Sequence, residues 1–238
     1  MTTRRTRETL LACWSGTTDP PGRAALGILV NAIRRDAPSV EVHDVPADQL
    51  RPDETPPGSW SDPPVRVAVP LALTDGTDVA QALEVARHDD PDIRIARPLG
   101  PDWTLAEICV KRLVEAGARK DDTIVLGVAG SHYEAAIDGY SRAARFLSAV
   151  WGGPVHVGSV GGRDTPLTDA IDIARAYGRR VVVSSYVLTP GQRADMLRHG
   201  GADLVTAPLL DGGPPDPRLV SLVLNRFHQA LGVGVPTL

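Results

Sequence analysis

The stretch VRVAVPLAL, residues 65–73, is a nearly continuous apolar run that ends in the small and acidic residues TDGTD, residues 74–78. A strand that is buried on both faces and opens into a polar loop has this pattern. A second stretch of the same kind, RVVVSSYVL, covers residues 180–188 and ends in Thr-Pro-Gly. We therefore predict two central strands, each followed by a polar loop at its carboxyl end.

The sequence around these two stretches repeats. The aligned pairs are VAVPLALTDG (67–76) with VVSSYVLTPG (182–191), IARPL (95–99) with VTAPL (205–209), and VEV (40–42) with VHV (155–157). A nearly constant offset over several segments indicates an internal duplication, here of roughly 110 residues. The second half of the chain is therefore expected to repeat the fold of the first.

Within each half, predicted strands and helices alternate. This order is typical of an open parallel sheet that helices cover on both faces. The sequence predicts an α/β fold of two duplicated, doubly wound lobes, residues 1–118 and 119–238, which face a central cleft. Residues 46–64 contain six prolines, and we expect an irregular connection there with a helical turn at most.

Composition restricts the class of protein. The chain has 238 residues, of which 42% are hydrophobic and 23% charged, as in globular proteins that bury a core. A net charge of -4 argues against nucleic acid as a partner, because phosphate binding usually needs a basic surplus. No apolar run approaches the roughly 20 residues that span a bilayer, so we expect no membrane association and a cytoplasmic protein. Cys13 and Cys109 form no CxxC pair, and no disulfide framework is expected.

Ligands of such sheets bind beyond the carboxyl ends of the strands. The loops to consider are residues 13–19, 44–48 and 75–78 in the first half, and 130–133, 158–164 and 188–192 in the second. Helix-start signals lie beside several of them. Asp78 is a candidate N-cap residue, and Thr104 with Glu107 and Ser131 with Glu134 have the spacing of a capping box.

Several of these segments resemble one enzyme family. LLACWSGTTDP, residues 10–20, resembles the AHGSRDP signature of the class II tetrapyrrole chelatases, and VAVPLALTDGTDV, residues 67–79, resembles their VPLFLSAGYHV segment. The segments RPLGP (97–101), AGS (129–131) and VSSYVL (183–188) are similar to the long, two-copy form of the family, the sirohydrochlorin chelatases. The likeness covers about residues 8–232, and it implies a two-lobed fold.

The family inserts a divalent metal into a macrocycle with two histidines and a nearby carboxylate. Neutral imidazole suits this task, because it can ligate the metal and accept a pyrrole proton near neutral pH. In this sequence the first histidine position falls on Cys13, or on Trp14 if the loop is aligned differently, and the second falls on Asp78. The resemblance therefore implies a site in which both signature histidines are replaced.

One interpretation retains the chemistry at the replaced positions. Cys13 and Asp78 would be the catalytic residues, and Cys13, Asp44 and Asp78 would hold the metal, with His43 as an alternative to Asp44. Thiolate and carboxylate together are suitable ligands for iron, cobalt or zinc. The metal, Co²⁺ or Fe²⁺, would be a substrate, and no organic cofactor is implied.

The substrate of this family is a polyacidic tetrapyrrole, so its pocket should offer cations and hydrogen-bond donors. The residues expected to contact it are Trp14, Ser15, Arg97 and Ser131, with Arg163 and Arg193 as further carboxylate clamps. Trp14 would either stack on the macrocycle or fill the space that a macrocycle would occupy. The glycine-rich loop of residues 158–162 could present backbone N–H groups to an anion.

The structural interpretation of the same residues is simpler. Cys13 would be a small buried residue at the end of a strand, as free cysteines usually are. Asp78 would only cap a helix. His132 would be either a ligand moved to the second half or an exposed residue near a helix start.

Three functions follow from these interpretations. The first is a sirohydrochlorin chelatase-like protein that inserts or handles Co²⁺ or Fe²⁺ in sirohaem or cobalamin biosynthesis. The second is a catalytically inactive relative that carries a tetrapyrrole or a metal, or assists an active chelatase. The third is a recruited enzyme with new chemistry around Cys13. The duplication favours either a pseudo-symmetric monomer or a homodimer.

Overall fold

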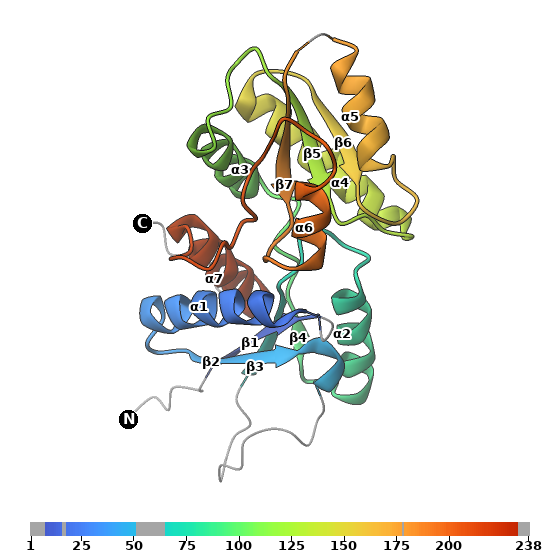
Figure 1. Cartoon of the computed structure of the whole chain (residues 1–238). Helices are drawn as coiled ribbons and strands as arrows, with labels where there is room; N and C mark the ends of the chain where they lie inside the picture. Colours follow the sequence, from blue (N-terminus) through green and yellow to red (C-terminus); the bar gives the residue numbers. More distant parts are fainter. Residues whose placement is uncertain (1–7, 16–17, 51–64, 178, 233–238) are drawn as a thin grey trace, which may run out of the picture.

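The computed structural model describes residues 8–15, 18–50, 65–177 and 179–232, and the structural statements below concern these ranges. Two four-stranded parallel sheets form the centres of two lobes (Figure 1). The first sheet has the order β2-β1-β3-β4 and the second the order β6-β5-β7-β8. The strands are β1 Glu8–Trp14, β2 Glu41–Pro46, β3 Val65–Pro70, β4 Arg94–Ile95, β5 Thr123–Val128, β6 Val155–Ser159, β7 Val181–Tyr186 and β8 Leu204–Val205. The predicted α/β fold of two parallel-sheet lobes is confirmed.

Helices connect successive strands and cover both faces of each sheet. They are α1 Pro20–Asp36, α2 Asp78–Asp89, α3 Trp103–Glu115, α4 Glu134–Trp151, α5 Leu167–Arg175, α6 Gln192–Arg198 and α7 Pro217–Leu231, with a short 3₁₀ helix, η1, at Ala47–Gln49. The helix η1 is the helical turn expected after β2, and the remainder of that connection, residues 51–64, lies outside the described residues. None of the helices in the described ranges is long and apolar enough to cross a bilayer.

The strand register tests the internal repeat. Leu10 pairs with Val67 and Val42, and its counterpart Ile124 pairs with Val182 and Val155. The predicted alignment of residues 67–76 with 182–191 is therefore confirmed. The predicted alignment of Val40 with Val155 is wrong by two residues, because Val40 precedes β2 and its N–H donates to the carbonyl of Ala37. The corrected register makes His43 and His156 equivalent.

The two halves exchange their last helices. Helix α3 follows β4 in the sequence but packs against α4 and β7 of the second lobe, and α7 packs against β3, β4 and α1 of the first lobe (Figure 1). One apolar cluster consequently runs through both lobes and contains residues of α1, α3, α4 and α7. The expected boundary at residue 118 lies between the two sheets, yet each sheet is covered by a helix from beyond that boundary.

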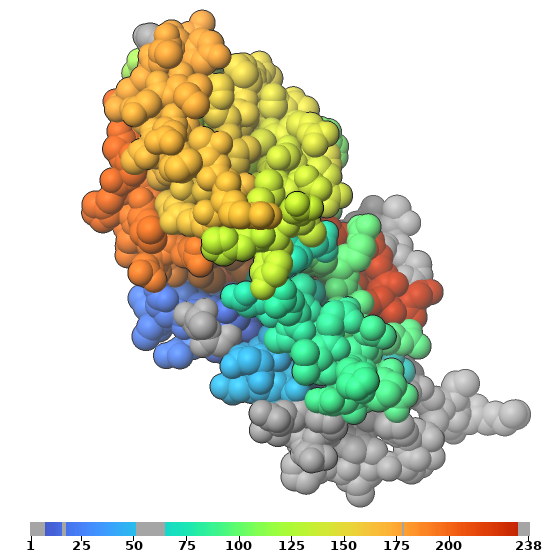
Figure 2. Space-filling model, turned by 90° about the vertical axis from the view of Figure 1, so that its right-hand side faces the viewer, coloured from blue at the N-terminus to red at the C-terminus, as the bar shows by residue number. Residues whose placement is uncertain are grey.

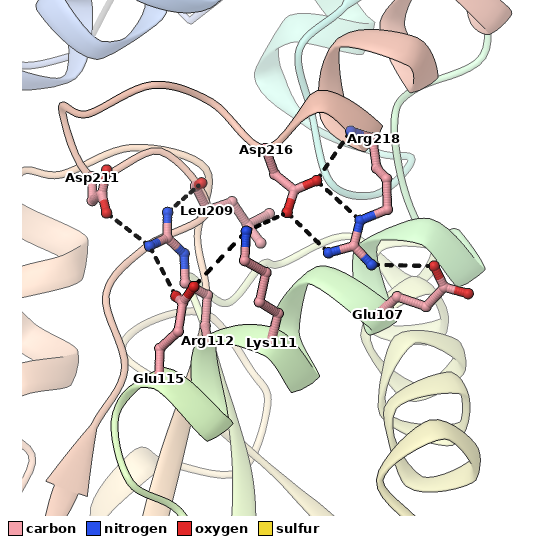
Figure 3. A network of polar contacts seen from close by, with 8 residues as sticks. All are labelled: Glu107, Lys111, Arg112, Glu115, Leu209, Asp211, Asp216 and Arg218. Carbon is pink, nitrogen blue, oxygen red and sulfur yellow. Dashed lines mark hydrogen bonds and ion pairs between the residues drawn. The ribbon is translucent and has the colours of Figure 1, made fainter.

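Polar contacts hold both crossing segments in place. Arg226 of α7 is 5% exposed and donates to the carbonyls of Pro98 and Leu99 at 2.9 and 3.1 Å, and to Asp102 at 2.7 Å. Figure 3 shows the second crossing, where three ion pairs join α3 to the described residues 209–218. They are Arg112–Asp211 at 2.8 Å, Lys111–Asp216 at 3.0 Å and Arg218–Glu107 at 3.4 Å, and Arg218 also pairs with Asp216 at 2.9 Å.

Two helix starts differ from the sequence prediction. The side chain of Thr77, rather than that of Asp78, caps α2 by accepting from the N–H of Ala80 at 3.3 Å. Asp102, rather than Thr104, caps α3 by accepting from the N–H of Thr104 at 2.9 Å. In both cases the helix begins early enough that the residue in the N-cap position lies one or two residues before the predicted cap.

A third predicted cap lies two residues before the N-cap position of its helix, which is Tyr133. The hydroxyl of Ser131 accepts from the N–H of Tyr133, which is the residue before α4, at 3.1 Å. Ser131 therefore orders the loop that leads into the helix rather than the first helical turn.

Candidate ligand-binding cleft

A cavity of about 390 Å³ opens between the lobes at the carboxyl ends of β1, β3, β5 and β7. Its volume falls within the range of about 300–1,000 Å³ that is typical of small-molecule sites, and its position is the one expected for parallel sheets. The first lobe lines it with Ser15, Thr18, Asp19 and residues 71–74 and 76–79, and the second with residues 129–131, Tyr133, Tyr140 and residues 186–193. Figure 2 shows one side of this junction, where the yellow-green segment before α4 meets the teal segment before α2.

Among the residues that the structure describes, three hydrogen bonds between the lobes lie around the cleft. The Asp19 carboxylate accepts from the N–H of Gln192 at 2.7 Å, the Tyr186 hydroxyl donates to the carbonyl of Leu73 at 3.1 Å, and the Thr74 hydroxyl donates to the carbonyl of Ala136 at 3.3 Å. The close approach of Asp19 requires glycine at position 191. Gly191 has a φ of +131°, and a Cβ there would overlap the Asp19 carboxylate.

Cys13 does not reach the cleft. Successive side chains of β1 point to opposite faces of the sheet, so Leu10 and Ala12 face the α1 side while Leu11 and Cys13 face α2. The Cys13 side chain is fully buried in an apolar cluster that includes Val79. This burial raises the pKa of the Cys13 thiol to about 12, so the thiol stays protonated at neutral pH and is a poor metal ligand.

The structure does not assemble the expected metal site. Asp44 is exposed and lies 3.6 Å from Arg34, while Asp78 is exposed at the start of α2 and lines the cleft. Across the described ranges, no group of three or more His, Cys, Asp or Glu side chains is placed to hold a metal ion. The expectation that Cys13, Asp44 and Asp78 share an ion is therefore corrected: the pleat turns Cys13 into the core, and Asp44 lies on the edge strand β2 beside Arg34.

The residues expected to contact a tetrapyrrole divide into two groups. Ser15 and Ser131 line the cleft, one from each lobe. Trp14 and Arg97 do not. Trp14 is half-buried against the apolar cluster shared by the lobes, and its buried indole N–H has no hydrogen-bond partner among the described residues. It therefore neither faces the cleft nor occupies the space expected for a macrocycle. Arg97 is exposed after β4 and lies outside the cleft lining.

Of the other candidate cations, only Arg193 lines the cleft. Its side chain starts from the first turn of α6, and its Nη1 donates to the carbonyl of Ala129 at 2.7 Å. Arg163 and His132 are exposed and lie outside the lining. His43 contacts Glu41 at 3.1 Å in β2, away from the cleft.

The glycine-rich loop packs on its neighbour, and several of its N–H groups are bonded within the protein. Within residues 158–163, the N–H groups of Ser159, Val160 and Arg163 donate to the carbonyls of Thr165, Val128 and Ser131. Gly130 has a φ of +80° and lies so close to Gly161 that a Cβ at Gly130 would overlap the Gly161 carbonyl. The loop therefore supports the cleft segment that contains Ser131.

Tyr140 is a cleft residue that sequence reasoning missed. It lies on the apolar stripe of α4 and therefore has the pattern of a core residue. The side chain is 5% exposed but lines the cleft. Burial, with a contribution from Asp164, raises the pKa of Tyr140 to about 12, and Arg193 opposes this rise. The hydroxyl is thus a neutral donor at neutral pH.

Comparison with known proteins identifies the fold of the chain but no family. No protein-family model matches the chain, and no curated protein matches it. Among solved structures the chain is similar to SirB from Bacillus subtilis with Fe³⁺, with a TM-score of 0.67 and 13% identity over 94% of this chain and 95% of that chain. It is also similar to CbiX, described as the terminal enzyme for biosynthesis of siroheme in denitrifying bacteria, with a TM-score of 0.59 and 19% identity over 92% and 98% of the two chains.

A third similar structure is a larger protein. DR2241 from Deinococcus radiodurans is described as a multi-domain protein with structural similarity to chelatases. The TM-score is 0.60 with 18% identity, and the match covers 94% of this chain but 55% of that chain. These three comparisons agree on one architecture across nearly the whole length of the protein. The chain therefore has the two-lobed, chelatase-like fold.

Proposed function

We propose that the protein binds a tetrapyrrole in the cleft between its lobes and holds it or passes it on, without inserting a metal. The fold supports this proposal, because the similar structures include SirB with Fe³⁺ and an enzyme of siroheme biosynthesis. One observation favours binding over insertion. The cleft lies where ligands of this architecture bind, but its described lining contains neither a histidine nor a cysteine.

Metal insertion requires groups that this lining lacks. A catalyst must hold the incoming metal and accept two protons from the pyrrole nitrogens, and neutral imidazole can do both near neutral pH. The Cys13 thiol is buried beneath α2. The Asp19 carboxylate already accepts a hydrogen bond from the N–H of Gln192. Asp78 is left as a single carboxylate at the start of α2, and a single carboxylate is a weak site for a divalent metal.

The cleft retains groups that suit a flat macrocycle with polar substituents. Leu71, Leu73 and Val187 provide apolar walls, and Tyr133 presents a ring that is 42% exposed beside the opening. An aromatic ring and aliphatic walls can pack against the face of a conjugated macrocycle. Arg193 supplies a positive charge for acidic substituents.

Metal insertion that depends on Asp78 is the second candidate function. The observation in its favour is that Asp78, which stands where the family resemblance places the second signature histidine, is exposed and lines the cleft. A carboxylate there could accept pyrrole protons while a solvated metal enters from the open side. This candidate predicts a rate of insertion above the spontaneous rate, and the rate should depend on Asp78.

A single experiment separates the two candidates. Purified protein is titrated with sirohydrochlorin, and binding is followed through the absorbance of the macrocycle. Co²⁺ or Fe²⁺ is then added, and the insertion rate is compared with the rate without protein. Binding with insertion at the spontaneous rate is the expected result. Absence of macrocycle binding would overturn the proposal.

Two variants complete the comparison. Asp78→Asn removes the cleft carboxylate, and Asp89→Asn changes an exposed carboxylate at the opposite end of the same helix. Insertion that is accelerated by the wild-type protein and by Asp89→Asn, but not by Asp78→Asn, would establish the second candidate function in place of the first.

A further inference from the structure

The internal repeat places two opposite charges at equivalent positions in the cleft. Val67 of β3 and Val182 of β7 are equivalent in the ladders, and Asp78 and Arg193 follow them at the same spacing. Each lies at the start of the helix after its strand, and both line the cleft. The two lobes thus present a negative wall and a positive wall to whatever lies between them.

The positive wall also contains an unused hydrogen-bond donor. Tyr140 is 5% exposed and lines the cleft, yet its hydroxyl has no hydrogen-bond partner within the described residues. The Tyr140 hydroxyl is not one of the buried side-chain atoms that lack a partner in the described residues, so it is open to the cleft, where a ligand oxygen can accept from it. Burial keeps the pKa of Tyr140 at about 12, which leaves the hydroxyl protonated and able to donate.

Arg193 is positioned beside this hydroxyl. One guanidinium nitrogen, Nη1, donates to the carbonyl of Ala129 at 2.7 Å, and this bond fixes the side chain against the loop after β5. Arg193 is close enough to Tyr140 to lower its pKa. A guanidinium held at one nitrogen still offers its other N–H groups, which suit the planar oxygen pair of a carboxylate.

We infer that Arg193 and Tyr140 form a subsite on the second-lobe wall of the cleft that receives a carboxylate substituent of the bound macrocycle. This inference rests on the proposed function, and it adds the orientation in which the macrocycle binds. The most acidic edge of the ligand faces the second lobe, and Asp78 on the first lobe repels the same substituents. The protein therefore selects acidic macrocycles and binds them in one direction.

Two nearby carboxylates could oppose an anion, and their placement decides the balance. Asp164 accepts from the N–H of Ser131 at 3.3 Å and lines a separate groove rather than the cleft, but its charge acts on Tyr140 and contributes to raising the pKa of that hydroxyl. Burial raises the pKa of Asp164, which weakens its negative charge at low pH. Asp19 is occupied by the N–H of Gln192. Arg193 and Tyr140 thus line the cleft with free donors, whereas the carboxylates of Asp164 and Asp19 each accept a backbone N–H.

The test compares sirohydrochlorin with its uncharged methyl ester. Dissociation constants of both are measured for the wild-type protein, Arg193→Gln and Tyr140→Phe. We expect the wild-type protein to prefer the acid, and each variant to lose about tenfold or more in affinity for the acid while its affinity for the ester stays the same. A hydrogen bond to a charged group is worth about 1.5–3 kcal/mol, which corresponds to this change.

Matched controls come from the same parts of the chain. Arg198→Gln changes an exposed arginine of α6 that pairs with Asp195, and Tyr177→Phe changes a tyrosine that is 64% exposed after α5. Neither residue lines the cleft, and both variants should bind the acid as the wild-type protein does.

The possible outcomes separate the subsite from the proposed function. If the wild-type protein binds neither the acid nor the ester, the proposed function fails. If it binds the macrocycle but Arg193→Gln and Tyr140→Phe leave the acid-to-ester preference unchanged, the subsite is overturned and the proposed function stands. An equal loss for acid and ester would also overturn it, because that result would show a general effect on the shape of the cleft.

Discussion

The hydroxyl of Tyr186, at the end of β7 in the second lobe, donates a hydrogen bond of 3.1 Å to the carbonyl of Leu73, which follows β3 in the first lobe. Tyr186 is 3% exposed, and its burial raises the pKa of the hydroxyl well above its ordinary value, so the donor is retained at all physiological pH values. The neighbouring carbonyl of Ala72 accepts from the N–H of Leu99 at 2.9 Å. One short segment after β3 is thus bonded both to its own lobe and to the other.

Removing this hydroxyl should weaken the whole protein. Tyr186→Phe keeps the buried ring and leaves the Leu73 carbonyl without its partner. We expect the free energy of unfolding to fall by about 1–2 kcal/mol, as for the loss of one buried hydrogen bond. Urea unfolding followed by circular dichroism measures this change. Tyr177→Phe, at an exposed tyrosine, is the control, and an equal effect of both substitutions would contradict the assignment.

The contact between Asp19 and Gln192 should control local opening of the cleft. Asp19→Ala removes the acceptor of the Gln192 N–H, and we expect hydrogen exchange of that amide to become about tenfold faster, which corresponds to about 1.4 kcal/mol. Asp19→Asn keeps an oxygen acceptor and should have a smaller effect. Asp36→Ala changes an exposed carboxylate at the other end of α1 and serves as the control. Unchanged exchange in Asp19→Ala would show that this contact does not restrain the lobes.

The fold was largely predictable from the sequence, apart from one long-range feature. The apolar runs and the repeat predicted two parallel sheets in duplicated lobes, because these signals are local and occur twice. The exchange of α3 and α7 was not predictable. The apolar stripe of an amphipathic helix shows that one face is buried, but it does not show which sheet buries it.

The site was predictable in position but not in chemistry. The segment resemblance placed Asp78, Ser15 and Ser131 in loops that do line the cleft. It also assigned Cys13 to the site, although the alternation of side chains along β1 turns this residue towards α2. Tyr140 was missed because a tyrosine on an apolar helix stripe has the pattern of a core residue, and only the packed structure shows that its hydroxyl reaches a cavity.

Both cysteines should be unreactive in the folded protein. Cys13 and Cys109 are buried, and burial raises the pKa of each thiol to about 12. Because the thiolate is the reactive form, a thiol reagent at pH 8 should modify neither residue in the native state and both after unfolding in urea. Rapid modification of Cys13 in the native protein would show that it reaches the cleft, and would revive its role as a ligand.

The ion pairs of Asp216 should make the stability depend on pH. The hydrogen bond from Arg218 is the main cause that lowers the pKa of Asp216 below its ordinary value, and Lys111 contributes. A group whose pKa is lower in the folded state stabilises the protein at pH values above its unfolded pKa, which is about 3.9 for an aspartate. This stabilisation is lost as the pH falls through the folded pKa.

Asp216→Asn tests this dependence while leaving the helix cap intact. Asparagine can still accept from the N–H of Arg218, which Asp216 does at 3.0 Å. We expect the free energy of unfolding of the variant to be about 1–3 kcal/mol lower than that of the wild-type protein at pH 7. This difference should shrink below about pH 4. Urea unfolding between pH 3 and pH 7 measures it. Asp195→Asn removes an exposed i,i+3 pair and should have little effect at any pH.

The exchange of helices makes a prediction about the halves of the chain. Residues 1–118 lack α7, which covers one face of the first sheet, and residues 119–238 lack α3, which covers part of the second. Each fragment alone would expose an apolar sheet face to water, so we expect neither to unfold cooperatively in urea. Expressed together, the fragments should associate, because α3 and α7 can then reach their sites.

A fusion of the first sheet to α7 provides the decisive comparison. A first-lobe chain that joins residues 8–96 through a flexible linker to residues 216–232 contains the first sheet and α7, and it should unfold cooperatively where the fragment of residues 1–118 does not. The free energy of burying an amphipathic helix belongs to the sheet that it covers, whatever the order of the two in the sequence. If instead residues 1–118 fold alone and the joined chain does not, the lobes are independent repeats and α7 contributes little to the first sheet.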